Sequence, residues 1–569
     1  MKIFLKLMVY SITLSWLFVS CKDYLEPILV PGTFTKEEVM KEYNYNKRLV
    51  ASIYSDIQLG FSRIDGAMLA SASDEAEHTL ETSNVHHFNR GSWNQFVNPD
   101  GAVWSVYYRG IRKINQFLVS SDSINFDLYK YDPNQQNVYQ TYLAEVNRWK
   151  YEVRFLRAYF YFELIKRYGG VPLITTAINE NFENIQRNSL DECIQFIVNE
   201  CDSAAKVLPA KYGSSELGRV TKVAALALKS RILLYGASEL FNNPSWAGGY
   251  AHSELISLNG DRQTRWRLAA NAAKEAIDVA KANGYSLAGD YNALFGPNTH
   301  NNTEVIFFRR EGINNYFEKA NLSVGFDLGQ SGTTPSQNLV DAYEMLNGKP
   351  ISDSESGYNP QNPYEYRDPR LKMTIVTNNS TFKGRTIECW EGGLDGPPIR
   401  QASKTGYYLK KYVNANLNLI RGETSTHSWV IFRLSEFYLN YAEALNEFDP
   451  GNTEIKTSVD MVRKRGNVNM PPLPEGLTQD QMRQRIYNER RVEFAFEEHR
   501  LWDVRRWMSA TSELSKPLKG VKISRDLYGN FNYTVTDVET RVFLPKMYFY
   551  PIPQNEIYID KKLIQNPLW

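Results

Sequence analysis

Cysteine and net charge are both scarce in this chain. Its 569 residues include only 4 Cys, too few for a fold held together by disulfides. Lys and Arg number 65 against 64 Asp and Glu, which gives a formal net charge of +1. Proteins that bind nucleic acid usually carry a clear positive excess, so this balance argues against a nucleic-acid partner.

Long hydrophobic runs are also missing, apart from one at the start of the chain. Lys2 and Lys6 accompany an apolar run over residues 7–19, which is the pattern of a secretory signal peptide. The run is shorter than the roughly 20 residues that a membrane-spanning helix needs. No other segment approaches that length, so we expect the mature chain to lie outside the membrane apart from any anchor.

A cysteine follows the apolar run directly. Ser20 and Cys21 resemble the lipobox of bacterial lipoproteins, although Phe18 stands where Leu is usual. We therefore predict a signal peptide over residues 1–20 and lipid attachment at Cys21. The alternative is an ordinary secreted protein in which this Cys occurs by chance.

Common catalytic and nucleotide-binding motifs are absent as well. The sequence contains no HExxH, GxSxG, GxGxxG, CxxC or Walker motif. A glycosidase needs two carboxylates facing each other across a cleft, and 64 acidic residues leave too many pairs to choose from. One stretch has enough carboxylates and imidazoles to bind a metal, but a solvated acidic turn is the favoured interpretation of Asp74, Glu75, Glu77, His78, His86 and His87.

The composition, with 43% hydrophobic and 23% charged residues, is typical of a folded globular protein. Apolar residues recur at helical spacing in several segments; Gly169 ends one of these helices and Thr221 caps another. Small and large residues alternate on adjacent helices, as in tetratricopeptide-like hairpins. The main predicted helices lie within residues 151–170, 219–240, 266–284, 435–447 and 479–507. The charged residues of the last one are interpreted as ion pairs along that helix: Glu489, Arg490, Glu493, Glu497, Arg500 and Arg505.

Residues 285–430 differ from the rest, because Gly, Pro, Asn and short β-like runs such as 304–308 dominate. No strand–helix alternation suggests a parallel sheet. Cys193 and Cys201 share a helical segment about 12 Å apart, beyond disulfide reach, so we expect buried thiols. The predicted fold is therefore mostly α, with tetratricopeptide-like helical hairpins and a loop-rich second half that contains a few short strands.

Aromatic residues are unusually frequent, at 13% of the chain. Most Trp residues fall in helical stretches, where core packing is the simplest interpretation. Trp93, Trp246 and Trp390 lie instead among Gly, Asn and Pro, where a ring has little core to join and can face a partner. Because aromatic rings stack on sugar rings and amides hydrogen-bond hydroxyl groups, Trp93 beside Asn94 is the leading prediction for sugar contact. The alternative is that Trp93 plugs the helical core.

Eight segments, in order along the chain, carry a resemblance to a known family. They are CKDYLEP (21–27), RFLRAYFYFELIKRYGGVPLIT (154–175), RVTKVAALALKSRILLYGASELFNN (219–243), DAYEMLNGK (341–349), YRDPRL (366–371), FRLSEFYLNYAEALNE (432–447), RRVEFAFEEHRLWDVRRW (490–507) and LIQNPLW (563–569). With these segments the chain resembles the SusD/RagB family of outer-membrane lipoproteins from Bacteroidetes over nearly the whole mature sequence.

The resemblance implies a function as well as a helical fold. It implies a surface lipoprotein that sits as a lid on a SusC-type TonB-dependent transporter and captures a nutrient, usually a glycan, without catalysis. Lys22 and Asp23 are similar to the charged signal that directs such lipoproteins to the outer face. No cofactor is required, and a structural calcium ion is left open. Two alternatives remain: the same scaffold binding a peptide or glycoprotein glycan, and a surface glycosidase.

The family's shared segments are mostly structural, so ligand residues do not transfer by motif. The candidates rest on chemistry and location, and they are Asp74, Trp93, Asn94, Tyr316, Trp390 and Trp246. The expected organisation is a signal peptide (1–20), an N-terminal helical part (21–330) and a C-terminal SusD/RagB-like part (331–569), the last two packed as one globular unit. The sequence does not identify the sugar or its linkage.

Overall fold

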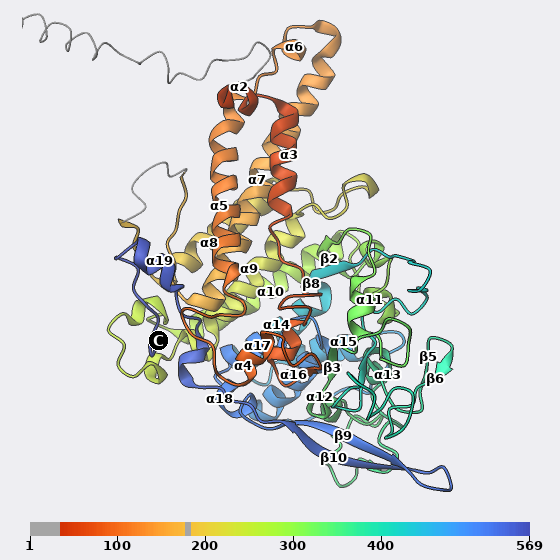
Figure 1. Ribbon diagram of the computed structural model, residues 1–569. Helices are drawn as coiled ribbons and strands as arrows, with labels where there is room; N and C mark the ends of the chain where they lie inside the picture. The colour runs from red at the N-terminus through yellow and green to blue at the C-terminus, as the bar shows by residue number, and fades with distance from the viewer. Residues whose placement is uncertain (1–34, 177–183) are drawn as a thin grey trace, which may run out of the picture.

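The computed structural model describes residues 35–176 and 184–569 (Figure 1), so the predicted signal peptide and Cys21 lie outside the described residues. Within those two ranges the chain is mostly helical, and its strands form short antiparallel pairs. The predicted fold class, helical hairpins followed by a loop-rich half with a few short strands, is confirmed. No helix in the described part of the chain is long and apolar enough to cross a membrane.

Helices of the first half pack against their neighbours in sequence. α5 contacts α3 and α7, α8 contacts α7 and α9, and α10 contacts α9 and α14. Figure 1 shows α3, α5 and α7 side by side, projecting away from the loop-rich half. The bounds are α2 Lys36–Met40, α3 Tyr43–Tyr54, α4 Val85–Asn89, α5 Ala102–Ser120, α6 Asp127–Lys130, α7 Gln136–Tyr168, α8 Leu190–Val207, α9 Lys222–Ala237 and α10 Arg262–Ala282.

Several predicted helix ends are confirmed by their capping geometry. α7 ends before Gly169, which adopts a φ of 73° that favours glycine. The hydroxyl of Thr221 caps α9 by accepting a hydrogen bond of 3.0 Å from the Ala224 backbone N–H. α7 begins at Gln136, however, and its 33 residues extend well beyond the predicted segment.

The second half holds most of the strands. The run predicted as a strand becomes β2 (Val305–Arg310), which pairs with β8 (Ser428–Arg433). β1 (Ala76–His78) pairs with β3 (Thr333–Pro335), which joins the two halves of the chain. The other pairs are β4 Ile375–Val376 with β7 Tyr408–Leu409, β5 Thr381–Phe382 with β6 Arg385–Thr386, and β9 Leu518–Arg525 with β10 Phe531–Glu539. The helices are α11 Tyr316–Asn321, α12 Gln337–Ala342, α13 Pro369–Thr374, α14 Leu434–Phe448, α15 Thr453–Arg463, α16 Gln479–Glu493, α17 Arg500–Arg506, α18 Ala510–Glu513 and α19 Gln554–Ile559.

The single long helix predicted over residues 479–507 is wrong. The chain leaves the helix after α16 and re-enters it at α17. Between them Phe496 and Glu498 adopt φ values of 64° and 63°, which a continuing helix does not allow. The break turns the Glu497 carboxylate toward Arg433 in the protein interior.

One continuous apolar core runs through both halves and includes residues from Tyr43 to Leu563. The Cys193 and Cys201 thiols are free and buried in it, as predicted. Because β1 and β3 pair across residue 330, the two predicted parts share a strand pair as well as this core. The boundary at residue 330 itself stays a prediction.

Candidate functional site

Trp93 lies in the interior, with only 2% of its surface exposed. Its ring centroid is 4.9 Å from that of Phe88, 5.1 Å from Tyr550 and 4.8 Å from Trp569. The exposed loop position expected for Trp93 is therefore wrong, because this aromatic cluster, built partly from the far C-terminus, gives the ring a core to join. The burial favours a structural plug; a ligand contact by Trp93 stays an untested prediction.

Two further candidates lie near this cluster. The Asn94 side-chain oxygen accepts hydrogen bonds from the backbone N–H groups of Phe96 (2.9 Å) and Val97 (3.1 Å), so it holds the turn of its own loop. Trp246 is half-buried, with its ring centroid 5.5 Å from Tyr548. A sugar contact by Asn94 or Trp246 stays a prediction.

Asp74 and its neighbours do not form a solvated turn, so that interpretation is also wrong. Asp74 is 5% exposed, and its carboxylate lies 2.6 Å from Arg491 Nη2 and 2.8 Å from Arg500 Nε. Burial alone would raise the pKa of this carboxyl, but the attraction of Arg491 and Arg500 outweighs burial and holds its pKa well below the ordinary value. Most other members of the stretch are also buried: Glu75, Glu77, His78 and His86.

Glu75 lies beside Asp74 and behaves in the opposite way. Burial, reinforced by the negative charge of Asp74, raises the pKa of Glu75 to about 8. A carboxylic acid that stays protonated at neutral pH is what a glycosidase uses as its general acid. Glu75 is only 1% exposed, however, so no sugar in solvent reaches it in this conformation. Among the described residues, no group of three or more His, Cys, Asp or Glu side chains is arranged to hold a metal ion.

Tyr316 is the first residue of α11, and Trp390 lies on the loop after β6 in the second half. The loop after α11 contacts the loop after β6, where Asp395 accepts a hydrogen bond from Ser323 and lies 2.7 Å from Arg385. We call the surface formed by residues 313–332 and 385–404 the loop face. Tyr316 is 71% exposed there, and the structure gives its ring no aromatic or hydrogen-bonding partner among the described residues.

Trp390 is less accessible than Tyr316. Its ring packs against the Gly392–Gly393 turn, so closely that a side chain at Gly393 would come within 3.0 Å of it. The Arg525 guanidinium lies 5.4 Å from the ring centroid. Trp390 is therefore half-buried, and Tyr316 is the candidate with the most accessible ring.

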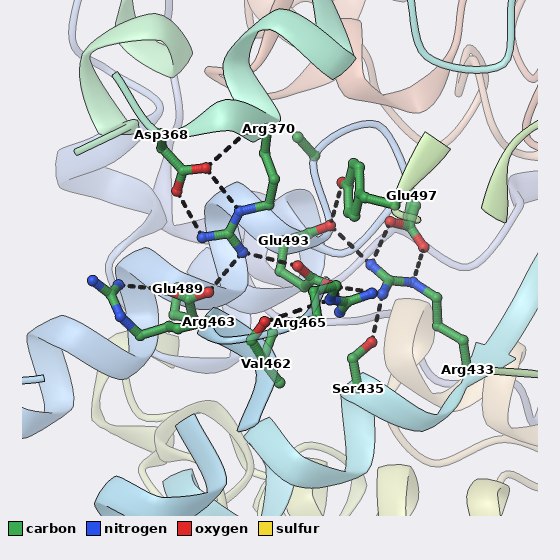
Figure 2. Close-up of polar contacts among 12 residues, drawn as sticks. Asp368, Arg370, Arg433, Ser435, Val462, Arg463, Arg465, Glu489, Glu493 and Glu497 are labelled. Atoms are coloured by element: carbon green, nitrogen blue, oxygen red, sulfur yellow. Dashed lines mark hydrogen bonds and ion pairs between the residues drawn. The ribbon is translucent and has the colours of Figure 1, made fainter. Parts of the chain in front are cut away.

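A buried network of arginines and carboxylates occupies the interior of the second half (Figure 2). Glu493 lies at its centre, 2.8 Å from Arg370 Nη1 and 2.5 Å from Arg433 Nη1, and it also pairs with Arg465. Residues 489–505, whose charges are predicted to pair along a single helix, thus form ion pairs with residues of several other elements. Arg370 also pairs with Asp368 and Glu489, and Glu489 pairs in turn with Arg463. Arg433 also pairs with Glu304 and Glu497.

Ionised carboxylates that are matched in this way cannot act as a general acid. Burial opposes ionisation of Glu489, but Arg370 and Arg463 outweigh it and lower its pKa. Arg370 and Arg463 lie 2.6 and 2.8 Å from the two Glu489 oxygens. The network therefore supports a structural role for the acidic residues of α16.

A sizeable cavity lies in a part of the molecule that the residue patterns did not predict as a site. It has a volume of about 730 Å³, within the range of about 300–1,000 Å³ typical of ligand sites. It lies between α3, the segment 214–219 and β2, with η11 (Thr299–Asn301) at one side. We call it the basic groove, because its lining includes Arg219, Arg309, Arg310 and His300 but no Asp or Glu. The cavity forms only where three segments distant in sequence meet, and none of these segments carries a motif that would predict it.

Comparison with known proteins gives consistent results along the whole described chain. The family model described as "SusD family" matches residues 303–569, and the one described as "Starch-binding associating with outer membrane" matches residues 38–234. A SusD-like protein of Formosa agariphila is 23% identical over 96% of this chain and 95% of its own length.

Solved structures agree with the sequence comparison. A SusD-like protein from Bacteroides fragilis is 28% identical, with a TM-score of 0.77 over 94% of this chain and 99% of its own. A SusD-like carbohydrate binding protein from the same organism is 25% identical, with a TM-score of 0.75 over 92% of this chain and 100% of its own. Family models, relatives and structures therefore converge, and the chain belongs to the SusD/RagB family.

Proposed function

We propose that this protein is a lipid-anchored outer-membrane lipoprotein that captures an oligosaccharide at the cell surface and delivers it to a TonB-dependent transporter. The observation that carries the proposal is the similarity over 92% of the chain to a SusD-like carbohydrate binding protein. The family model that describes association with the outer membrane supports the location. The lipid anchor rests on Cys21 and the apolar run before it.

Capture without catalysis agrees with the state of the carboxylates. The acidic residues of α16 are ionised and matched by arginines, and the carboxyl group with a raised pKa, Glu75, is buried. The loop face offers a binding surface of the kind that stacks on sugars, with Tyr316 exposed and without a partner for its ring. We therefore assign sugar contact to Tyr316 first and to Trp390 second.

Calorimetric titration of the mature protein with a panel of neutral oligosaccharides tests capture. Tyr316→Ala should weaken binding by about 1–3 kcal/mol, the usual contribution of an aromatic side chain at a binding surface. Tyr131→Ala is the matched control, because Tyr131 is also 71% exposed but follows α6 in the helical first half. Equal weakening by both variants, or no binding of any glycan, would contradict the assignment.

Affinity purification from the native membrane tests delivery. The tagged wild-type protein should bring down a barrel of the TonB-dependent class, since a lid on a transporter needs an interface above roughly 1,000 Å². Cys21→Ala should move protein from the membrane fraction to the soluble one unless the transporter alone retains it. Recovery of the lipoprotein without any barrel would contradict the delivery step.

A further inference from the structure

Two arginines line the basic groove without a direct ion pair to any carboxylate of the described residues. Arg309 and Arg310 end β2, and neither has an Asp or Glu within ion-pair distance among the described residues. Arg309 donates a hydrogen bond to the Ile57 carbonyl, and Arg310 Nη2 lies 3.4 Å from the Thr426 hydroxyl. Their hydrogen bonds thus go to neutral oxygens, and the carboxylates of Glu311 and Asp56 act on Arg309 only at longer range.

The acidic residues near the groove are already engaged elsewhere or stand apart. Glu152 lies 2.9 Å from Arg219 and 3.2 Å from Arg148. Asp56 lies 2.7 Å from Lys113 and 3.4 Å from Arg109. Glu311 follows Arg310 in the chain but forms no ion pair with a described residue. Glu311 offsets part of the charge, but two unpaired arginines against one unpaired carboxylate still leave the groove a positive excess, in a chain whose overall charge is close to zero.

Other groups in the groove suit a sugar. His300 Nδ1 is buried and has no hydrogen-bond partner among the described residues, and Ser214, Ser215 and Asn301 add exposed polar groups. Phe308 supplies an apolar wall. Hydroxyl, amide and imidazole groups around an aromatic wall match the alternating polar and apolar surface of a sugar ring.

We propose that the basic groove is a binding site, separate from the loop face, for an acidic oligosaccharide whose carboxylate or sulfate group lies between Arg309 and Arg310. Guanidinium groups bind such anions with paired, charge-assisted hydrogen bonds. The choice of a sugar rests on the proposed function, whereas the choice of an anion rests on the groove itself. Because carboxylate and sulfate groups share this chemistry, the test includes one carboxylated and one sulfated oligosaccharide.

Calorimetry with three probes separates the possibilities: trigalacturonate, a sulfated galactose oligosaccharide and neutral maltotriose. We expect wild type to bind at least one acidic probe, more weakly as salt rises. The double variant R309Q/R310Q should lose binding by tenfold or more. R310Q alone should lose several-fold and leaves the Arg309 contact with Ile57 in place. The matched control is R267Q, which removes an exposed arginine of α10 that forms no ion pair with a described residue.

The outcomes distinguish this site from the proposed function. If neutral glycans bind at the loop face but neither acidic probe is sensitive to R309Q/R310Q, the groove proposal fails and glycan capture stands. If no oligosaccharide of any kind binds, glycan capture fails, and inorganic sulfate then decides the groove. Greater thermal stabilisation of wild type than of R309Q/R310Q by sulfate would keep the anion site, and equal stabilisation would overturn it.

Discussion

The arginines of this protein fall into two environments that differ in how their charge is neutralised. In the buried network, Arg370, Arg433 and Arg465 converge on Glu493, and each also pairs with at least one further carboxylate. In the basic groove, Arg309 and Arg310 bond to neutral oxygens and form no direct ion pair with a carboxylate of the described residues. The first group is buried, whereas Arg310 is exposed and Arg309 half-buried.

The difference separates stability from recognition. A buried charge without a partner is costly, so a matched network must keep all its members. A charge at the wall of an open cavity stays hydrated and can remain unmatched until a ligand arrives. Removing one residue from each environment should therefore have different consequences.

The largest effect is expected at the centre of the network. Glu493→Gln leaves three buried arginines without their shared carboxylate and should lower the free energy of unfolding by about 3–5 kcal/mol. Urea unfolding measures the change. Glu475→Gln, on an 86% exposed side chain, is the control and should change stability by less than about 0.5 kcal/mol. Similar stability of the two variants would show that the network is not important for the fold.

A comparable loss is expected at Trp93, through packing instead of charge. Trp93→Ala should lower the free energy of unfolding by about 3–5 kcal/mol, because a buried aromatic side chain is replaced by a cavity. Binding of a neutral glycan should be unchanged under conditions where the variant stays folded. A variant with wild-type stability and weakened glycan binding would restore Trp93 as a ligand residue.

These two sites also mark how far the sequence alone can predict the molecule. Helical periodicity and capping predicted α9 and the end of α7, because those signals are local. The burial of Trp93 depends on Tyr550 and Trp569, which lie more than four hundred residues along the chain. The basic groove depends on segments near residues 54, 217 and 309 that no local pattern connects. Contacts between distant segments decide both, so composition and spacing do not predict them.

An intermediate effect is expected in the pH dependence of stability, through the buried Glu75. Burial raises the pKa of Glu75 to about 8, so its folded form holds a proton that the unfolded chain releases near its ordinary pKa of 4.5. Its contribution to stability therefore falls as pH rises from about 4.5 to about 8. Relative to wild type, Glu75→Gln should gain at least about 1.4 kcal/mol between pH 5 and pH 9, the equivalent of one pKa unit. Parallel stability profiles of the two proteins would contradict the raised pKa.

A carboxyl group that is paired with basic residues should change stability with pH in the opposite direction. Burial opposes ionisation of Glu163, but Lys166 and Arg167 outweigh it and lower its pKa to about 2. The stability that Glu163 contributes is present above about pH 4.5 and is lost as the pH falls toward 2. Glu163→Gln should therefore flatten the acid limb of the unfolding profile, and an unchanged acid limb would contradict this.

The smallest effect on stability is expected in the groove. Arg310→Gln removes an exposed charge with no carboxylate partner and should change the free energy of unfolding by less than about 0.5 kcal/mol. Thermal and urea unfolding beside the R267Q control measure it. A loss comparable to that of Glu493→Gln would place Arg310 among the structural arginines and remove the distinction between the two environments.

A crystal structure of the mature protein with trigalacturonate tests that distinction most directly. We expect one carboxylate of the ligand in the basic groove, with its oxygens about 3 Å from guanidinium nitrogens of Arg309 and Arg310. The side chains of the buried network should remain as they are in the free protein (Figure 2). Trigalacturonate bound only at the loop face, with the groove empty at saturating ligand, would contradict a binding role for the unmatched arginines.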